Sequence, residues 1–146
     1  MSNVLRISEA ATIGLHAMVL IAGERKPRTT REIAEAFDFS EAHLSKVLQR
    51  LVRSRLLLST RGPGGGFTIA RQPEDISLLD VYEAIEGPLV ASDCLLARPL
   101  CEGGRDCLLG GLLIDLNNRV ADYLAGTKLS HLIGTFQKLM EDKHAR

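Results

Sequence analysis

The first half of the chain alternates apolar and polar positions with the period of α-helices. Residues 7–23 are apolar on most sides and end in Gly23, which predicts a buried helix with a glycine stop. Thr29 and Glu32 have the spacing of a capping box, and Ser40 has the position of the next N-cap, so two short helices should follow. In the second of these, apolar residues recur at i, i+3, i+4 and i+7, namely Leu44, Val47, Leu48 and Leu51. Two short helices joined by a tight turn predict a helix-turn-helix.

The segment after these helices predicts a β-hairpin. Residues 56–59 and 67–70 read as strands, and they flank Gly62-Pro63-Gly64-Gly65-Gly66, which is rich in residues that adopt unusual backbone dihedrals. A hairpin directly after a helix-turn-helix is the wing of a winged helix. A nucleotide-phosphate loop is disfavoured, because such a loop continues into Lys-Ser/Thr and a helix, whereas the residues here continue as a strand.

The second half of the chain predicts three more helices around an aperiodic segment. Ser77 and Asp80 form a capping box for a helix that stops at Gly87, and a long helix is predicted over 108–124, before a final helix. Because the long helix has a wide apolar face outside the compact head, we predict that it is a subunit interface. The predicted fold class is mainly α with a small β-hairpin wing. Its parts are a winged helix-turn-helix DNA-binding domain (1–87), a cysteine-containing sensor loop (88–107), and a dimerisation helix with a C-terminal helix (108–146).

The distribution of charge changes this picture. The chain has 146 residues and a net charge of zero, yet residues 1–73 hold 11 Lys and Arg against 6 Asp and Glu, and residues 74–146 hold 7 against 12. A basic first half fits a head that binds a polyanion, although chance asymmetry of solvated faces would give the same numbers. No apolar stretch reaches the roughly 20 residues that span a bilayer, and no signal peptide is evident, so we expect a cytoplasmic protein without membrane contact.

The second helix of the predicted helix-turn-helix is its recognition helix. This helix and the wing supply the candidate DNA contacts. Ser45 and Gln49 carry groups that donate to or accept from base edges, and Lys46 can reach guanine or phosphate in a major groove about 12 Å wide. Arg61 at the base of the wing would meet phosphate or the minor groove. The full set of predicted DNA contacts is Thr29, Thr30, Ser40, Ala42, His43, Ser45, Lys46, Gln49, Arg50, Arg61, Gly64 and Gly65. A winged helix used only for protein contacts is the alternative.

All three cysteines of the chain, Cys94, Cys101 and Cys107, lie within fourteen residues. In a cytoplasmic protein, clustered cysteines indicate metal or redox chemistry more often than structural disulfides. Thiolates suit an iron–sulfur cluster, and the short spacing lets the sulfurs converge, whereas zinc favours Cys-x2-Cys pairs and four ligands. A thiol redox sensor and three unreactive cysteines are the other open interpretations. Since no catalytic motif is present and the four histidines are scattered, we do not predict an enzyme.

A series of short motifs along about residues 4–125 forms a recognisable combination. They are Leu5-Arg6-Ile7-Ser8, Leu15-His16-Ala17, Leu44-Ser45-Lys46-Val47-Leu48, Arg61-Gly62-Pro63-Gly64-Gly65-Gly66-Phe67, Ala70-Arg71-x-Pro73, Ile76-Ser77-Leu78-x-Asp80-Val81, Glu83-Ala84-Ile85-Glu86-Gly87 and the three cysteines. In this combination the chain resembles the Rrf2 family of bacterial winged-helix transcription regulators. The resemblance implies a homodimer, joined largely by the long helix, on a pseudo-palindromic operator in double-stranded DNA. It also implies a [2Fe-2S] or [4Fe-4S] cluster on the three cysteines that senses cluster status, nitric oxide or redox state.

The fourth cluster ligand departs from part of that family pattern. Several relatives carry a histidine three residues after the third cysteine, where this chain has Gly110. Other relatives take the ligand from the N-terminal helix, often that of the partner subunit, and the matching region here contains Thr12 and His16, with Glu9 nearby. His16 is chemically suited to be a metal ligand, and it could equally be a buried structural residue.

The predicted function is therefore a dimeric, sequence-specific DNA-binding regulator whose DNA affinity is controlled by an iron–sulfur cluster. A regulator without a cluster, which senses redox state through thiols and a disulfide, is the alternative. A protein-interaction module built on the acidic half is a third hypothesis. Salt-dependent binding to duplex DNA separates the two regulators from the interaction module.

Overall fold

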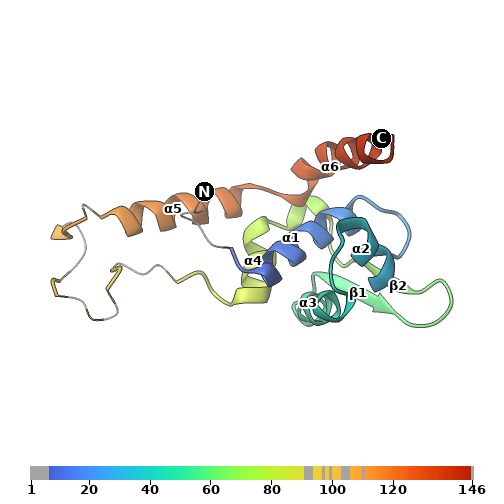
Figure 1. The fold of residues 1–146 in the computed structure, drawn as a ribbon, viewed down its shortest axis with the longest axis horizontal. Coiled ribbons are helices and arrows are strands. Elements are labelled where there is room, and N and C mark those ends of the chain that lie inside the picture. Colours follow the sequence, from blue (N-terminus) through green and yellow to red (C-terminus); the bar gives the residue numbers. More distant parts are fainter. Residues whose placement is uncertain are drawn as a thin grey trace.

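The computed structural model describes residues 7–90, 94–96, 98, 100–102, 106–109 and 111–145, so the motif residues Leu5 and Arg6 and the position of Gly110 lie outside it. In Figure 1, α5 extends from a compact head and α6 lies back over α1. The observed fold is mainly α with a two-stranded antiparallel hairpin, which confirms the predicted class. The elements are α1 (Glu9–Ala22), α2 (Thr30–Phe37), α3 (Glu41–Arg53), β1 (Leu57–Thr60), β2 (Gly66–Ile69), the 3-10 turn η1 (Pro73–Asp75), α4 (Leu78–Glu86), α5 (Leu112–Gly126) and α6 (Leu129–His144).

The hydrophobic core lies where α1, α3 and α4 meet. The predicted stripe of α3 is buried as expected, with Leu44, Val47, Leu48 and Leu51 all at most 2% exposed. Gly14 lets α1 approach α4 closely, because a Cβ at this position would lie 2.0 Å from Cδ1 of Ile85. Leu124 of α5 and Leu129 of α6 belong to the same core cluster. The C-terminal helices therefore complete the packing of the head.

Side-chain caps fix where the helices begin. The hydroxyl of Thr29 accepts the N–H of Glu32 at 3.2 Å, and the N–H of Thr29 donates to the Glu32 carboxylate at 2.8 Å, which is the predicted capping box of α2. The bonds from the backbone and the hydroxyl of Thr29 lower the pKa of the Glu32 carboxyl. Ser77 and Asp80 form the predicted box of α4, and Ser40 caps α3.

The wing is the predicted hairpin, with each strand shifted by one residue. Leu57 lies opposite Ile69, and Thr60 lies opposite Gly66. Arg28, in the connection from α1 to α2, extends the hairpin, because its N–H donates to Phe67 O at 3.1 Å and its carbonyl accepts the Phe67 N–H at 2.8 Å. The base of the wing is thereby joined to the helix-turn-helix by backbone hydrogen bonds.

Helix α5 begins at Leu112, four residues after the predicted start at residue 108. Gly111 immediately before it has a left-handed backbone with φ of 73°, so the chain turns there and the helix cannot extend further toward the N-terminus. Leu108 and Leu109 lie in a turn and are 95% and 50% exposed. No described helix has both the length and the apolar character needed to cross a membrane.

Candidate DNA-binding surface and cysteine segment

The outer face of the helix-turn-helix carries most of the predicted DNA contacts. Because the apolar stripe of α3 faces the core, its opposite side is turned to solvent, where Ala42, Lys46 and Gln49 are exposed and Ser45 is half-buried. Thr29 and Ser40 use their hydroxyls as helix caps, and Thr30 is the half-buried first residue of α2. The small and polar face that the sequence predicts on α3 is therefore accessible.

Two of the predicted DNA contacts are turned toward the protein. His43 is half-buried, and its Nδ1 lies 3.8 Å from Oε2 of Glu9 in α1. Arg50 reaches α4, where its Nη1 donates to the backbone oxygen of Ile85 at 3.0 Å. Both residues flank the outer face of α3. Their positions in the sequence do not reveal the contacts that they make with α1 and α4. A DNA contact by either residue remains a prediction.

The wing presents one open glycine and one enclosed glycine. Gly64 is exposed with φ of 72°, and nothing lies within 4 Å of where its Cβ would be. Gly65 is different, because a Cβ there would lie 2.3 Å from the Thr60 carbonyl oxygen. Gly65 therefore serves the tight turn of the hairpin, and Gly64 leaves the tip narrow. Arg61 is exposed beside them, as predicted.

Two exposed arginines at the end of the recognition helix and just after it are not among the predicted DNA contacts. Arg53 lies in the last turn of α3, and Arg55 follows it with a left-handed backbone. Like Lys46 and Arg61, both side chains are exposed, and exposed basic side chains are the groups that bind phosphates. The excess of basic residues in the first half of the sequence was the signal that could have identified them.

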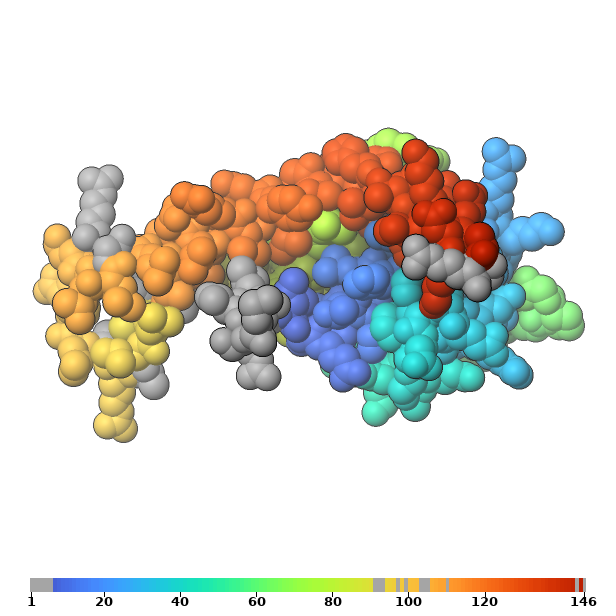
Figure 2. All heavy atoms as spheres, turned by 45° about the horizontal axis from the view of Figure 1, so that its top comes forward, coloured from blue at the N-terminus to red at the C-terminus, as the bar shows by residue number. Residues whose placement is uncertain are grey.

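The three cysteines lie in the segment between α4 and α5. Cys94 and Cys107 are half-buried, Cys101 is exposed, and none of the three forms a disulfide. The N–H of Leu96 donates to Sγ of Cys94 at 3.4 Å. Figure 2 shows this segment at the end of the molecule that is remote from α3.

The chemistry of the three thiols favours a cluster site, but their arrangement within one chain does not form one. Three thiols are the right chemistry for an iron–sulfur cluster. Within the described part of the chain, however, no group of three or more His, Cys, Asp or Glu side chains is placed to hold a metal ion. A single chain in this conformation therefore offers the sulfur ligands without a formed site.

His16 lies exposed on α1, in the head. Its Nδ1 is 2.7 Å from the backbone oxygen of Thr12, and because a carbonyl only accepts, Nδ1 carries the proton of the neutral ring. The lone pair then resides on Nε2, which is the form in which histidine binds metals. The ring stands edge-on to Phe37, with centroids 5.5 Å apart. The prediction that His16 has ligand chemistry fits this geometry, but within one chain it does not form a metal site with the cysteines.

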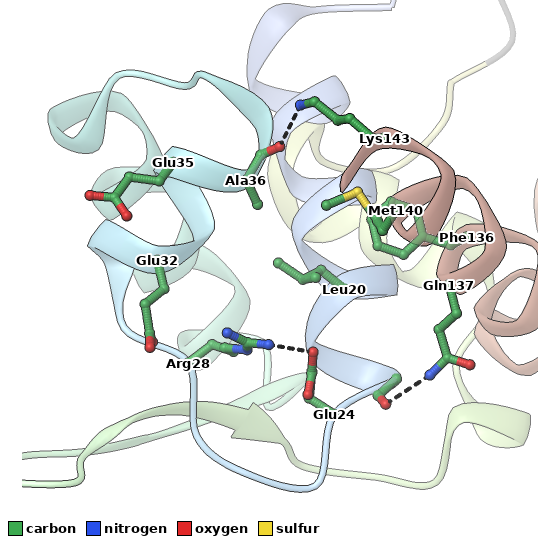
Figure 3. A pocket seen from close by; sticks show the side chains of 11 residues that line it. Leu20, Glu24, Arg28, Glu32, Glu35, Ala36, Phe136, Gln137, Met140 and Lys143 are labelled. Atoms are coloured by element: carbon green, nitrogen blue, oxygen red, sulfur yellow. Dashed lines mark hydrogen bonds and ion pairs between the residues drawn. The ribbon is translucent and has the colours of Figure 1, made fainter. Parts of the chain in front are cut away.

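A groove of about 540 Å³ separates α6 from α1 and α2 (Figure 3). Two hydrogen bonds cross it, from Gln137 Nε2 to Gly23 O and from Lys143 Nζ to Ala36 O, both at 3.3 Å. On its wall, Arg28 pairs with Glu24 at 2.6 Å. Since the polar side chains that line the groove have partners within the protein, the groove is explained by the docking of α6 on the head.

The comparison with known families decides the identity of this fold. The sequence model of the Rrf2 family, described as an iron-dependent transcriptional regulator, matches residues 7–135. The chain belongs to the Rrf2 family. It is a DNA-binding transcriptional regulator of the winged-helix type.

Individual Rrf2 proteins agree with this assignment. The regulator IscR of Pectobacterium atrosepticum is 28% identical over 137 residues, which cover 92% of this chain and 83% of that relative. The regulator BadM of Rhodopseudomonas palustris is 40% identical over 83 residues, which cover 56% of this chain and only 53% of BadM. The structure of CymR, the global cysteine regulator of B. subtilis, superposes with a TM-score of 0.75 at 26% identity and covers 90% of this chain and 98% of CymR. These relatives are transcription regulators and not enzymes, in agreement with the sequence prediction.

Proposed function

We propose that this Rrf2 protein is a dimeric regulator whose affinity for a specific operator is set by an iron–sulfur cluster on Cys94, Cys101 and Cys107. The observation that carries the proposal is the grouping of all three thiols of the chain in the segment that joins the head to α5. Similarity to IscR over most of the chain supports it. A bound cluster would supply a centre, [2Fe-2S] or [4Fe-4S], that responds to iron supply, nitric oxide or redox state.

The DNA is bound in this proposal by the exposed face of α3 and by the wing. Ser45 and Gln49 read base edges in the major groove, while Lys46 and Arg61 contact phosphates. Thr29 and Ser40 cap the first turns of α2 and α3, and in this proposal those turns face the sugar-phosphate backbone. Residues 1–87 are the DNA-binding unit in this proposal, and residues 108–146 join two copies.

The second copy packs on the apolar face of α5. Within one chain, Leu124 is the only residue of α5 that is fully buried among those that the structure describes. Leu109, Leu112 and Tyr123 remain 50%, 46% and 64% exposed. Large apolar side chains left exposed on α5 and just before it are typical of contact with a partner, and two-fold symmetry would present two α3 helices to the half-sites of a pseudo-palindrome.

The dimer also bears on the incomplete ligand set. Because His16 does not form a metal site with the cysteines of its own chain, we propose His16 of the partner subunit as the fourth ligand. Its exposed position and the lone pair on Nε2 fit that role. The replacement His16→Ala should then change the visible spectrum of the loaded protein without preventing dimerisation.

Anaerobic purification with visible absorption and iron and sulfide analysis tests the cluster. We expect a coloured protein that contains iron and sulfide, and a colourless protein when Cys94, Cys101 and Cys107 are all replaced by serine. A wild-type protein that stays colourless and free of iron after anoxic reconstitution with iron and sulfide would refute cluster binding. Selection of duplexes from a random-sequence pool tests DNA recognition separately.

A regulator that senses redox state through the thiols alone is the second candidate. Cys101 is exposed and the three cysteines form no disulfide, and an accessible thiol of this kind suits direct oxidation. The structural likeness to CymR supports the same reading. Mass spectrometry after treatment with diamide should then show a disulfide between Cys101 and Cys107, together with altered operator affinity. Unchanged thiols and unchanged affinity would eliminate this candidate.

A further inference from the structure

The last turn of α4 is held by two other helices. Arg50 of α3 donates from Nη1 to the carbonyl oxygen of Ile85 at 3.0 Å. The next residue, Glu86, accepts a hydrogen bond from the hydroxyl of Ser8, which is the N-cap of α1. Ile85 itself is buried and packs against Gly14 of α1. Ile85 and Glu86 at the end of α4 are thus hydrogen-bonded to α3 and to the N-cap of α1, respectively.

The same turn is the point where the chain leaves the head toward the cysteines. Gly87 ends α4 with φ of 85°, and Leu89 is anchored by its N–H to the carboxylate of Glu83 at 3.0 Å. Cys94 follows Gly87 by seven residues. The last turn of α4, with the carbonyl that Arg50 holds, therefore lies where the chain leaves the head for the cysteine segment.

The hydrogen bond from Arg50 to Ile85 stabilises the C-terminal end of α4. The last carbonyls of a helix lack partners within the helix and carry partial negative charge, so a guanidinium at this place both donates a hydrogen bond and meets a favourable charge. A side chain engaged in this way is directed toward α4, whereas Lys46 and Gln49 on the same helix have no such protein contact described and face solvent.

We infer that Arg50 is a positioning residue that couples the cysteine segment to the recognition helix through the last turn of α4, and that it is not a phosphate contact. The inference rests on the proposed function, because it requires that the state of the cysteines affects operator affinity. It reassigns a residue that the sequence alone places among the DNA contacts.

A double-mutant cycle tests the coupling. The probe is a duplex selected by the wild-type protein from a random-sequence pool, and every protein is reconstituted anaerobically with iron and sulfide. Operator affinity is measured with the native cysteines and with all three replaced by serine, and the ratio of the two dissociation constants is the cysteine factor. In the Arg50→Met background we expect affinity to weaken roughly three- to tenfold and the cysteine factor to move toward one.

Two control variants separate positioning from DNA contact. Lys46→Met should lower the slope of log affinity against log salt by about one and keep the cysteine factor, since it removes one phosphate contact. Arg53→Met removes the same charge from the last turn of α3 and should also keep the cysteine factor. Arg50→Met should leave the salt slope at the wild-type value, and Arg50→Lys, which keeps a charged donor, should restore part of the factor.

The possible results separate the role of Arg50 from the proposed sensor function of the cysteines. A cysteine factor of one in the wild-type background refutes the sensor function. A factor that differs from one in the wild type and is unchanged in Arg50→Met overturns the inference alone. So does a salt slope that falls by about one in Arg50→Met. If Arg50→Met is too unstable to measure, Arg50→Lys decides by the same two readouts.

Discussion

Replacing Gly66 by alanine should detach the base of the wing from the head. Gly66 opens β2 with φ of 142°, a conformation that side chains of L-residues rarely adopt. An added Cβ would lie 2.6 Å from the carbonyl oxygen of Arg28, which is a backbone atom and cannot rotate away. The same oxygen accepts the N–H of Phe67 at 2.8 Å. The clash therefore falls on the bridge that joins the wing to the helix-turn-helix.

The expected loss in the free energy of unfolding has two sources, backbone strain and broken hydrogen bonds, and relieving one increases the other. Backbone strain at such a position costs about 1–3 kcal/mol, and each of the two hydrogen bonds between Arg28 and Phe67 contributes about 1 kcal/mol. Because the wing can relieve the strain by giving up the bridge, the costs do not add fully, and we expect a loss of about 2–3 kcal/mol. Gly64 provides the matched control, since its φ is 72° with nothing near its Cβ, so that Gly64→Ala should cost about 1 kcal/mol.

Urea unfolding followed by far-ultraviolet circular dichroism measures both losses, and the slope of the titration shows whether the native state has stayed compact. Duplex binding by the two variants shows whether the attached wing is needed for affinity. If Gly66→Ala and Gly64→Ala destabilise the protein equally, the close approach to Arg28 carries no cost, and this account of how the wing is attached would be refuted.

Three further predictions concern the core, the cap of α2 and the dimer. Leu48 is fully buried, so Leu48→Ala should lower the free energy of unfolding by about 3 kcal/mol in the same urea titration; a loss below about 1 kcal/mol would contradict the packing. Glu32→Gln should destabilise the protein at neutral pH, because a lowered native pKa gives stability that is present above the ordinary value of 4.5 and is lost as the pH falls below it. The stability difference between Glu32→Gln and wild type, followed by urea titration across pH, should therefore vanish in acid; a constant difference would argue against a role of the charge. Leu112→Asp should produce monomers in sedimentation velocity, whereas Asn118→Asp, exposed elsewhere on α5, should remain dimeric.

The features that the sequence predicted correctly depend on residues within one or two helical turns of each other. The capping boxes at Thr29 and at Ser77 join residues three positions apart, so their spacing is visible in the sequence. The buried stripe of α3 likewise follows from helical periodicity. Local patterns of this kind determine the helix starts in the head and the presence of the hairpin.

The features that the sequence did not predict come from contacts between distant segments. The bridge of Arg28 to Phe67 and the bond of Arg50 to Ile85 join residues far apart in the chain, and no local spacing marks them. Helix α5 starts late because Gly111 adopts a left-handed backbone, although the apolar period continues through Leu108 and Leu109. The cysteines show the same limit, since residue type predicts thiol ligands but does not determine where the three sulfur atoms lie.

The position of α4 determines which part of the DNA surface can respond to the cysteines. Both routes from the cysteine segment into the head reach α4, one through Gly87 and the other through α5, which packs on α4. Helix α3 also packs on α4, and close-packed helices shift as units because their interface does not deform continuously. The wing packs on α3 through β1, but it is also held by α1 through β2 and by the backbone bridge to Arg28, so it should move less than α3 does. A signal at the cysteines should therefore alter base reading by α3 more than phosphate contact by the wing, and specific affinity should change more than affinity for unrelated duplexes at the same salt concentration.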